Sequence, residues 1–215
     1  MSCKFIEFEL SRRFVLPASS AAIVKVHKIL VKSGFKVDPV VYIDRKKGEA
    51  TYGVLETVAR PNHPDQMHYG DPDKDPLAQI LERGRREKRI AVLDGLRDVP
   101  AKSRSDVSWD ETHNFVVPEV INTIPDLKEL VTKSGIVFRV PTRREFLSAG
   151  EKYSHFWNVD SWEWLYDDGS FDDWLFGDYR NIVGGGFKID NWPSNSRAPH
   201  ISFRLLAVSP PQKLL

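Results

Sequence analysis

The chain lacks cysteine pairs, long apolar runs and any large excess of charge. Its single thiol, Cys3, excludes an internal disulfide framework. With 31 basic and 30 acidic residues the formal net charge is +1, so no global field attracts nucleic acid or an anionic membrane. No apolar run reaches the roughly 18 residues that a membrane-spanning helix needs, and Glu7 falls where a signal peptide has its apolar core. We therefore expect a cytoplasmic protein, of a cell or of a virus that infects one, without membrane or nucleic-acid partners.

The distribution of aromatic residues divides the chain. All six tryptophans lie beyond residue 105, whereas the first hundred residues carry Val, Ile, Leu and most of the basic runs. We interpret residues 1–104 as a mixed α/β region and residues 105–215 as a loop-rich domain. No Gly/Ser-rich linker separates them, which favours two regions around a shared core over two independent units.

Local patterns predict elements in both regions. Capping residues, glycine stops and proline positions indicate helices at 21–33, from Pro76 into 83–89, at 126–133 and after Pro141-Thr142. Runs of β-branched and aromatic residues indicate strands at 40–43, 52–55, 90–93, 136–140 and 202–208. The first two of these strands form a predicted hairpin. Beyond residue 155, short segments broken by Gly, Asp, Asn and Pro predict little further helix.

Five short segments follow one another in the order of a known signature. They are Val107–Glu111, Phe138–Phe146, Asp160–Trp164, Val183–Phe187 and Phe203–Leu206. They resemble the motifs V-S-W-x-D/E-A, R-L-P-T-x-x-E-W, V-W-E-W, R-G-G-S-W/F and G-F-R-L of the formylglycine-generating-enzyme-like (sulfatase-modifying factor) branch of the C-type lectin fold. The resemblance covers about residues 105–208 and implies an α+β, C-type-lectin-like fold. Phe146, Gly184 and Ser202 stand where the family has Trp, Arg and Gly, so they mark a distant member.

These segments also have physical roles. Thr142 and Glu145 have the spacing of a helix capping box, and three successive glycines at 184–186 permit positive φ angles or close backbone approach. In Trp162-Glu163-Trp164 we expect one ring in the core and the other toward a neighbouring loop. Five aromatic residues are expected to share one buried core: Phe138, Trp162, Trp164, Phe187 and Phe203.

The resemblance does not extend to catalysis. Formylglycine-generating enzymes use a cysteine pair near the C-terminal end, and this chain has no cysteine after Cys3. Serine does not replace a thiolate as a soft-metal ligand. Other proteins of the lectin fold, including variable proteins of phages and bacteria, contact ligands with their C-terminal loops. We therefore expect a non-catalytic binding protein with a protein partner. The alternatives are an enzyme with a divergent His/Asp metal site and a structural adaptor of a phage or secretion assembly.

The segment from Trp157 to Trp192 mixes aromatic residues with acids. Aromatic side chains of this kind dominate binding hot spots. The structural alternative is that the rings build the core while the acids lie in solvated turns. Trp174 and Trp192 are the predicted anchors because polar turn residues flank each of them. The predicted ligand-binding residues are Trp174, Trp192, Asp172, Asp173, Tyr179 and Asn195.

Cofactors are not expected, although two segments contain possible metal ligands. Asp167, Asp168 and Asp172 supply oxygen donors around a glycine turn, which suits calcium; a plain acidic turn is the favoured interpretation. A Pro-rich loop holds further histidines and aspartates that we expect to face solvent: His63, Asp65, His68, Asp71, Asp73 and Asp75. The basic run at 83–89 has the charge to contact phosphates, but a solvated helix end is favoured there too.

Overall fold

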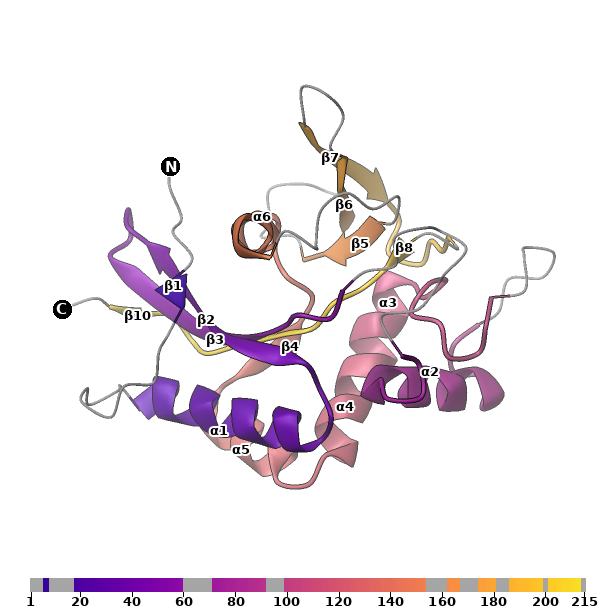
Figure 1. Cartoon of the computed structure of the whole chain (residues 1–215), viewed down its shortest axis with the longest axis horizontal. Helices are drawn as coiled ribbons and strands as arrows, with labels where there is room; N and C mark the ends of the chain where they lie inside the picture. Colours follow the sequence, from indigo (N-terminus) through magenta and orange to yellow (C-terminus); the bar gives the residue numbers. More distant parts are fainter. Residues whose placement is uncertain are drawn as a thin grey trace.

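The computed structural model is a mixed α+β structure with two sheets (Figure 1). It describes residues 6–7, 18–59, 71–91, 99–153, 162–166, 174–180, 186–198 and 201–213. The α+β class predicted from the sequence is confirmed. Within these ranges, no helix combines the length and the apolar character needed to cross a bilayer.

The larger sheet combines strands from both regions of the chain. Its order is β1-β2-β3-β9-β4, β10 also pairs with β3, and each of these pairings is antiparallel. The strands are β1 (Ile6–Glu7), β2 (Val37–Asp44), β3 (Glu49–Glu56), β4 (Val137–Arg139), β9 (Leu206–Val208) and β10 (Gln212–Lys213). The predicted hairpin is the β2–β3 pair. In its turn the Asp44 carboxylate accepts hydrogen bonds from two backbone N–H groups, those of Lys46 and Lys47.

The helices lie around this sheet, and α1 and α5 lie on the side away from the second sheet (Figure 1). They are α1 (Ala18–Lys32), α2 (Pro76–Arg86), α3 (Trp109–Glu111), the π-helical turn η2 (Thr112–Val116), α4 (Val117–Thr123), α5 (Leu127–Ser134) and α6 (Arg143–Lys152). Predicted capping is confirmed at α2, where Asp75 Oδ1 accepts the Leu77 N–H at 3.0 Å. Gly34 and Gly135 follow α1 and α5 with φ angles of +89° and +66°, as their predicted stop positions require.

The second sheet has the order β7-β6-β5-β8. Its strands are β5 (Trp162–Leu165), β6 (Trp174–Arg180), β7 (Gly186–Trp192) and β8 (Ile201–Ser202). The β5–β6 and β6–β7 pairs are antiparallel, and the β5–β8 pair is parallel. Trp174 and Trp192 are register partners at one end of the β6–β7 hairpin, and β7 forms the outer strand among the described residues.

One hydrophobic core joins both regions, including Val26, Leu77, Phe138, Trp164 and Phe203. Trp162 is partly buried against the same core, and the side chain of Phe187 lies outside the described part of the chain. The two tryptophans of β5 therefore do not diverge as we expected, because residues two apart in a strand lie on the same face. The residue between them, Glu163, is fully buried on the other face.

Two predicted strands differ in the structure. Residues 202–208 do not form one strand: β8 ends at Ser202 in the second sheet and β9 begins at Leu206 in the first. The chain crosses between the sheets at residues 203–205, where the buried Arg204 bonds to groups of both sheets. The strand predicted at 90–93 is absent at Ile90 and Ala91, and residues 92–98 lie outside the described ranges.

Candidate binding surface

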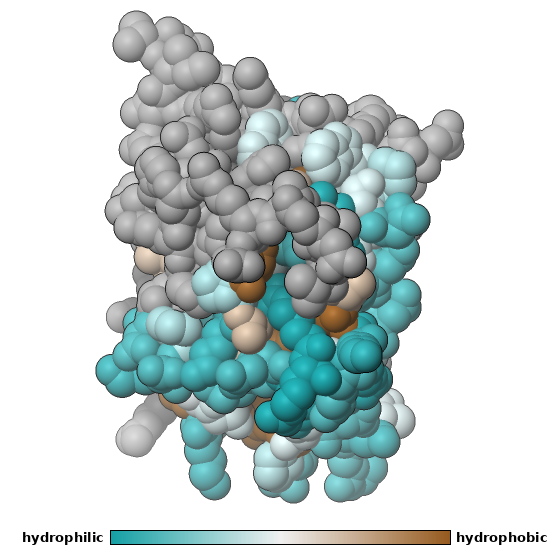
Figure 2. Space-filling view, turned by 90° about the vertical axis from the view of Figure 1, so that its right-hand side faces the viewer, coloured by the Kyte–Doolittle hydropathy of each residue, from teal (hydrophilic) through white to brown (hydrophobic). Residues whose placement is uncertain are grey.

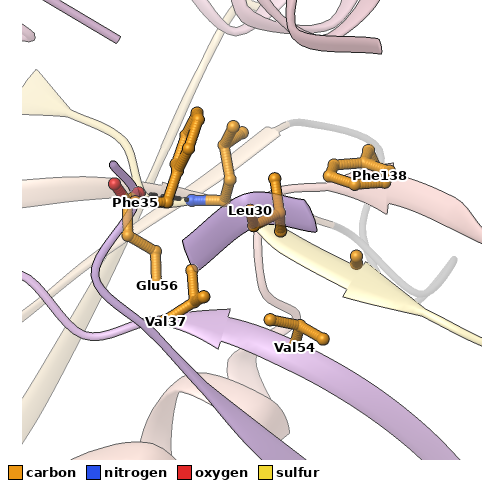
Figure 3. Close-up of a pocket in the computed structure, with 8 residues that line it drawn as sticks. Leu30, Phe35, Val37, Val54, Glu56 and Phe138 are labelled. Carbon is orange, nitrogen blue, oxygen red and sulfur yellow. Dashed lines mark hydrogen bonds between the residues drawn. The ribbon is translucent and has the colours of Figure 1, made fainter. Parts of the chain in front are cut away.

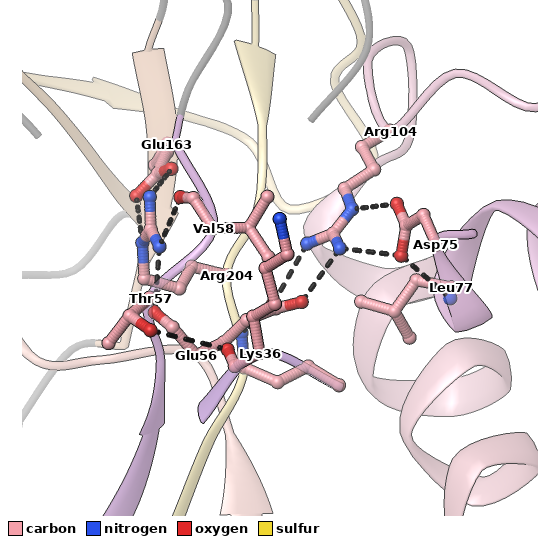
Figure 4. Close-up of polar contacts among 10 residues, drawn as sticks. Lys36, Glu56, Thr57, Val58, Asp75, Leu77, Arg104, Glu163 and Arg204 are labelled. Atoms are coloured by element: carbon pink, nitrogen blue, oxygen red, sulfur yellow. Dashed lines mark hydrogen bonds and ion pairs between the residues drawn. The ribbon is translucent and has the colours of Figure 1, made fainter. Parts of the chain in front are cut away.

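The buried Arg204 holds the second sheet against the N-terminal region. Arg204 forms a two-point ion pair with Glu163 of β5, with Nη2–Oε1 and Nε–Oε2 distances of 3.0 and 3.2 Å (Figure 4). Its Nη1 donates to the carbonyl oxygens of Glu56 and Val58 at 2.7 and 3.0 Å. Neither side chain of the pair has appreciable contact with solvent. The pair therefore fixes β5 to the end of β3. Residue 167, where the predicted binding segment begins, follows β5 closely in sequence.

Arg104 makes a second buried network. Its guanidinium bonds to the Glu56 carboxylate at 2.7 and 2.8 Å and to both Asp75 oxygens at 2.7 Å (Figure 4). Burial opposes the charged guanidinium, but the two carboxylates outweigh burial and raise the pKa of Arg104. Because Asp75 also caps α2, this network ties β3, the start of α2 and the buried segment around Arg104 into one unit.

A cluster of aromatic and cationic side chains lies at the end of β5. The rings of Trp109 and His113 stack with centroids 3.6 Å apart, and the Tyr166 ring lies 6.3 and 6.2 Å from them. The Arg139 guanidinium lies 5.1 Å from the centre of the Tyr166 ring. Glu145 holds that guanidinium with two hydrogen bonds of 2.7 and 2.8 Å. We call Trp109, His113, Arg139 and Tyr166 the His113 cluster.

The local sequence explains the position of this cluster. Ser108 and Glu111 form a capping box that starts α3, and Thr142 and Glu145 form the predicted capping box of α6. The π-helical turn η2 continues α3, and single π-helical turns frequently occur at functional sites. Trp109 and His113 are four residues apart, so they are neighbours on the helix surface.

His113 has a lone pair on Nε2 for which the described residues supply no hydrogen-bond donor. Its Nδ1 lies 3.0 Å from the carbonyl oxygen of Trp109, and because a carbonyl only accepts, Nδ1 carries the proton. Its Nε2 is shielded from solvent and has no hydrogen-bond partner. The pKa of His113 is lowered from 6.5 to about 4. Burial is the largest cause and the Arg139 charge adds to it, whereas the Trp109 hydrogen bond and Asp110 oppose the shift. A buried acceptor without a donor costs about 1–3 kcal/mol, so a donor from a ligand or a water molecule would stabilise this atom.

The His113 cluster is joined to the turn that follows β7. The Asp110 N–H donates to the Ser194 carbonyl at 3.1 Å, and Ser194 Oγ donates to the Asp110 carboxylate at 2.9 Å. Arg197 forms an ion pair with Glu111 and donates to the Asp106 carbonyl at 2.9 Å. The turn before Arg197 is thus fixed to the same helix start that presents Trp109.

The predicted ligand-binding residues fall into three groups. Asn195 is exposed in the turn after β7, and Trp192 is partly buried with its ring against the main core. Trp174 and Tyr179 are in β6, where the structure describes only the backbone. Asp172 and Asp173 lie outside the described residues. The same holds for Asp167 and Asp168, so the predicted calcium turn lies there as well.

The other polar segments are engaged in the fold. Across the described ranges, no three His, Cys, Asp or Glu residues are grouped so that they could hold a metal ion. Asp71, Asp73 and Asp75 form ion pairs with Lys74, Lys102 and Arg104 respectively, and His63, Asp65 and His68 lie outside these ranges. In the basic run, Arg83 pairs with Glu119, Arg85 donates to carbonyl groups, and Arg89 lies 4.3 Å from the centre of the Phe115 ring.

A cavity beside Glu56 has a volume of about 10 Å³ and is otherwise lined by apolar side chains such as Leu30, Phe35 and Phe138 (Figure 3). It has room for about one water molecule. The cavity beside Glu56 is therefore too small for a ligand larger than water. The face shown in Figure 2 is mostly hydrophilic where it is coloured, with small separate apolar patches.

Sequence reasoning gave no role to His113 and did not identify the His113 cluster. The available signal was the spacing of Trp109 and His113 directly after a capping box. Arg139 comes from β4 and Tyr166 follows β5, so their contributions have no local signal.

Comparison with protein-family models, with curated proteins and with solved structures finds no match for the chain.

Proposed function

We propose that the chain is a non-catalytic binding protein with a C-type-lectin-like domain, and that it recognises a protein partner through the loop surface between Asp167 and Ser196. Two features of the described structure support this proposal, the position of the motif residues and the anchoring of the surface. The amino-acid composition of the segment adds a third argument.

The motif residues support the lectin-like fold because segments far apart in the sequence meet through them. Glu163 of the W-E-W segment pairs with Arg204 of the F-R-L segment in the interior. Tyr166, just after the W-E-W segment, donates its backbone N–H to Pro141, which begins the P-T-x-x-E segment, at 2.8 Å. In this fold the W-E-W, F-R-L and P-T-x-x-E segments therefore hold distant parts of the chain together.

The anchoring of the surface is the observation that carries the proposal. The Glu163–Arg204 pair fixes the strand before residue 167, and the Asp110–Ser194 bonds fix the turn at the other end. Proteins commonly carry recognition residues on loops whose ends are held by a rigid scaffold. The buried ionic networks provide such a scaffold here.

The composition of the surface favours a protein partner. It contains Trp174, Tyr179 and Trp192, and tryptophan and tyrosine are enriched among residues that dominate protein interfaces. Asn195 is exposed and adds a polar group at the edge. The near-neutral charge of the chain gives no comparable reason to expect nucleic acid.

Photo-cross-linking tests both the partner class and the place of contact. A photoreactive amino acid is inserted at Asn195, and a matched variant carries it at Asn122, which is also exposed but lies on α4. We expect light-dependent protein adducts in extracts of the native host only for position 195, identified by mass spectrometry. Equal adducts at both positions, or adducts at position 122 alone, would contradict the proposal.

A further inference from the structure

We propose that the His113 cluster is a recognition site for an aromatic ring that carries one O–H or N–H donor, such as the side chain of a tyrosine or tryptophan of the partner. This inference rests on the proposed function and specifies the chemistry of one contact. The ligand would place its ring beside Trp109 and Tyr166 and donate its proton to Nε2 of His113.

The hydrogen bonds of His113 define what the site accepts. Nδ1–H is committed to the Trp109 carbonyl, so Nε2 offers only a lone pair. A lone pair binds a donor and repels an ionised oxygen, so a carboxylate is disfavoured as a ligand. The neutral form of the imidazole is maintained near pH 7 because burial lowers the pKa of His113.

The neighbours of His113 define the remainder of the ligand. Trp109 and Tyr166 present two aromatic rings whose centroids are 6.3 Å apart. This separation is a contact between the two rings themselves, and a ligand ring would add to them through further offset or edge contacts. Arg139 lies against Tyr166 and disfavours a second cation there, although Glu145 partly neutralises it. An uncharged ring with a single donor would match the lone pair of His113 and the two neighbouring rings.

The partial exposure of the His113 cluster allows a ligand to approach it. Trp109, His113 and Tyr166 are each partly exposed, whereas the Nε2 atom itself is shielded. A ligand therefore reaches Nε2 only when the rings shift slightly. The cluster adjoins the proposed surface, because Asp110, next to Trp109, is bonded to Ser194.

The test uses small probes and the full-length chain labelled with ¹⁵N-histidine. Phenol and indole supply the ring and the donor. Toluene lacks the donor, benzoate replaces it with an anion, and benzylamine replaces it with a cation. His27 is the internal control because its Nε2 lies 3.2 Å from the Val37 carbonyl and therefore carries the proton, the opposite tautomer to His113.

We expect phenol and indole to shift the Nε2 resonance of His113 in a saturable manner, while the His27 resonances do not move. Toluene, benzoate and benzylamine should leave Nε2 unchanged. His113→Phe keeps a flat ring and removes the lone pair, and it should weaken phenol binding by at least about tenfold.

No saturable shift with phenol or indole would overturn the inference, as would an equal shift with toluene or unchanged phenol affinity in folded His113→Phe. If that variant does not fold, the contrast between phenol and toluene on the unaltered chain decides. These probes need no partner, so their result is independent of the cross-linking at Asn195. A positive probe result with failed cross-linking would keep this site and reject the loop surface.

Discussion

The carboxylate of Glu163 and the guanidinium of Arg204 face each other in the interior, where both side chains are almost completely removed from solvent. Glu163 belongs to the second sheet, and Arg204 also donates to two carbonyl groups at the end of β3 in the first. The pair is therefore the polar connection between the two sheets. Because a buried charge without its partner is costly, the two residues depend on each other.

Replacing one member of this pair should be strongly destabilising. We expect Glu163→Gln to lower the free energy of unfolding by about 3–5 kcal/mol, since it leaves the Arg204 charge buried and uncompensated. Urea unfolding measures the change. Glu129→Gln is the control because its ion pair with Lys133 is largely exposed, and surface pairs contribute at most about 1 kcal/mol. Similar losses for both variants would contradict a special role for the buried pair.

Gly84 should not tolerate even a methyl group. In a helix interior, Gly→Ala usually stabilises by up to about 1 kcal/mol. Here the added Cβ would lie 2.9 Å from Ile90 Cδ1 and closer still to the Phe115 ring. We expect Gly84→Ala to destabilise the protein by about 1–3 kcal/mol through overpacking. Phe115→Leu should recover part of the loss in the double variant, as measured by thermal unfolding. A Gly84→Ala variant more stable than the parent would show that α2 does not pack against η2 in this way.

The stability of the protein should depend on pH through His113. Its pKa is lowered in the folded state, so the unfolded chain binds more protons between pH 6.5 and about 4. The contribution of neutral His113 to the free energy of unfolding is therefore complete above pH 6.5 and is lost as the pH falls toward 4. The facing charged groups are Arg139, which lowers the pKa, and Asp110, which raises it.

His113→Phe isolates this contribution from that of other titrating groups. Between pH 7.5 and 4.5, the parent should lose about 1–3 kcal/mol more unfolding free energy than the variant. Urea unfolding at both pH values gives the difference. Identical losses in the two proteins would mean that His113 is not held neutral by burial.

Much of the fold was predictable because its signals are local. Asp75-Pro76 and Thr142 with Glu145 predicted helix starts, and the structure contains both caps. Gly34 and Gly135 predicted helix ends because glycine readily adopts the positive φ angles that both have in the structure. Such features depend on neighbouring residues alone, so a sequence pattern contains all the information that they need.

The rest depends on contacts between distant residues. The strand predicted at 202–208 is interrupted because Arg204 requires carbonyl groups of β3 and the carboxylate of Glu163, none of which is near in sequence. Likewise, polar neighbours of Trp192 indicated a surface ring, but the structure packs this ring partly against the core. Its role in binding stays a prediction, and its replacement should affect stability as well as affinity.

The most direct test of the central claim is the affinity of the partner for two matched variants, measured by calorimetry. Asn195→Arg places a bulky charge in the proposed surface, and Asn122→Arg places the same charge on α4. Both positions are exposed, so both variants should keep the parent's thermal unfolding midpoint. We predict that Asn195→Arg weakens binding at least about tenfold, or about 1.4 kcal/mol, while Asn122→Arg binds as the parent does. Unchanged affinity for folded Asn195→Arg, or an equal loss for Asn122→Arg, would contradict a binding surface between Asp167 and Ser196.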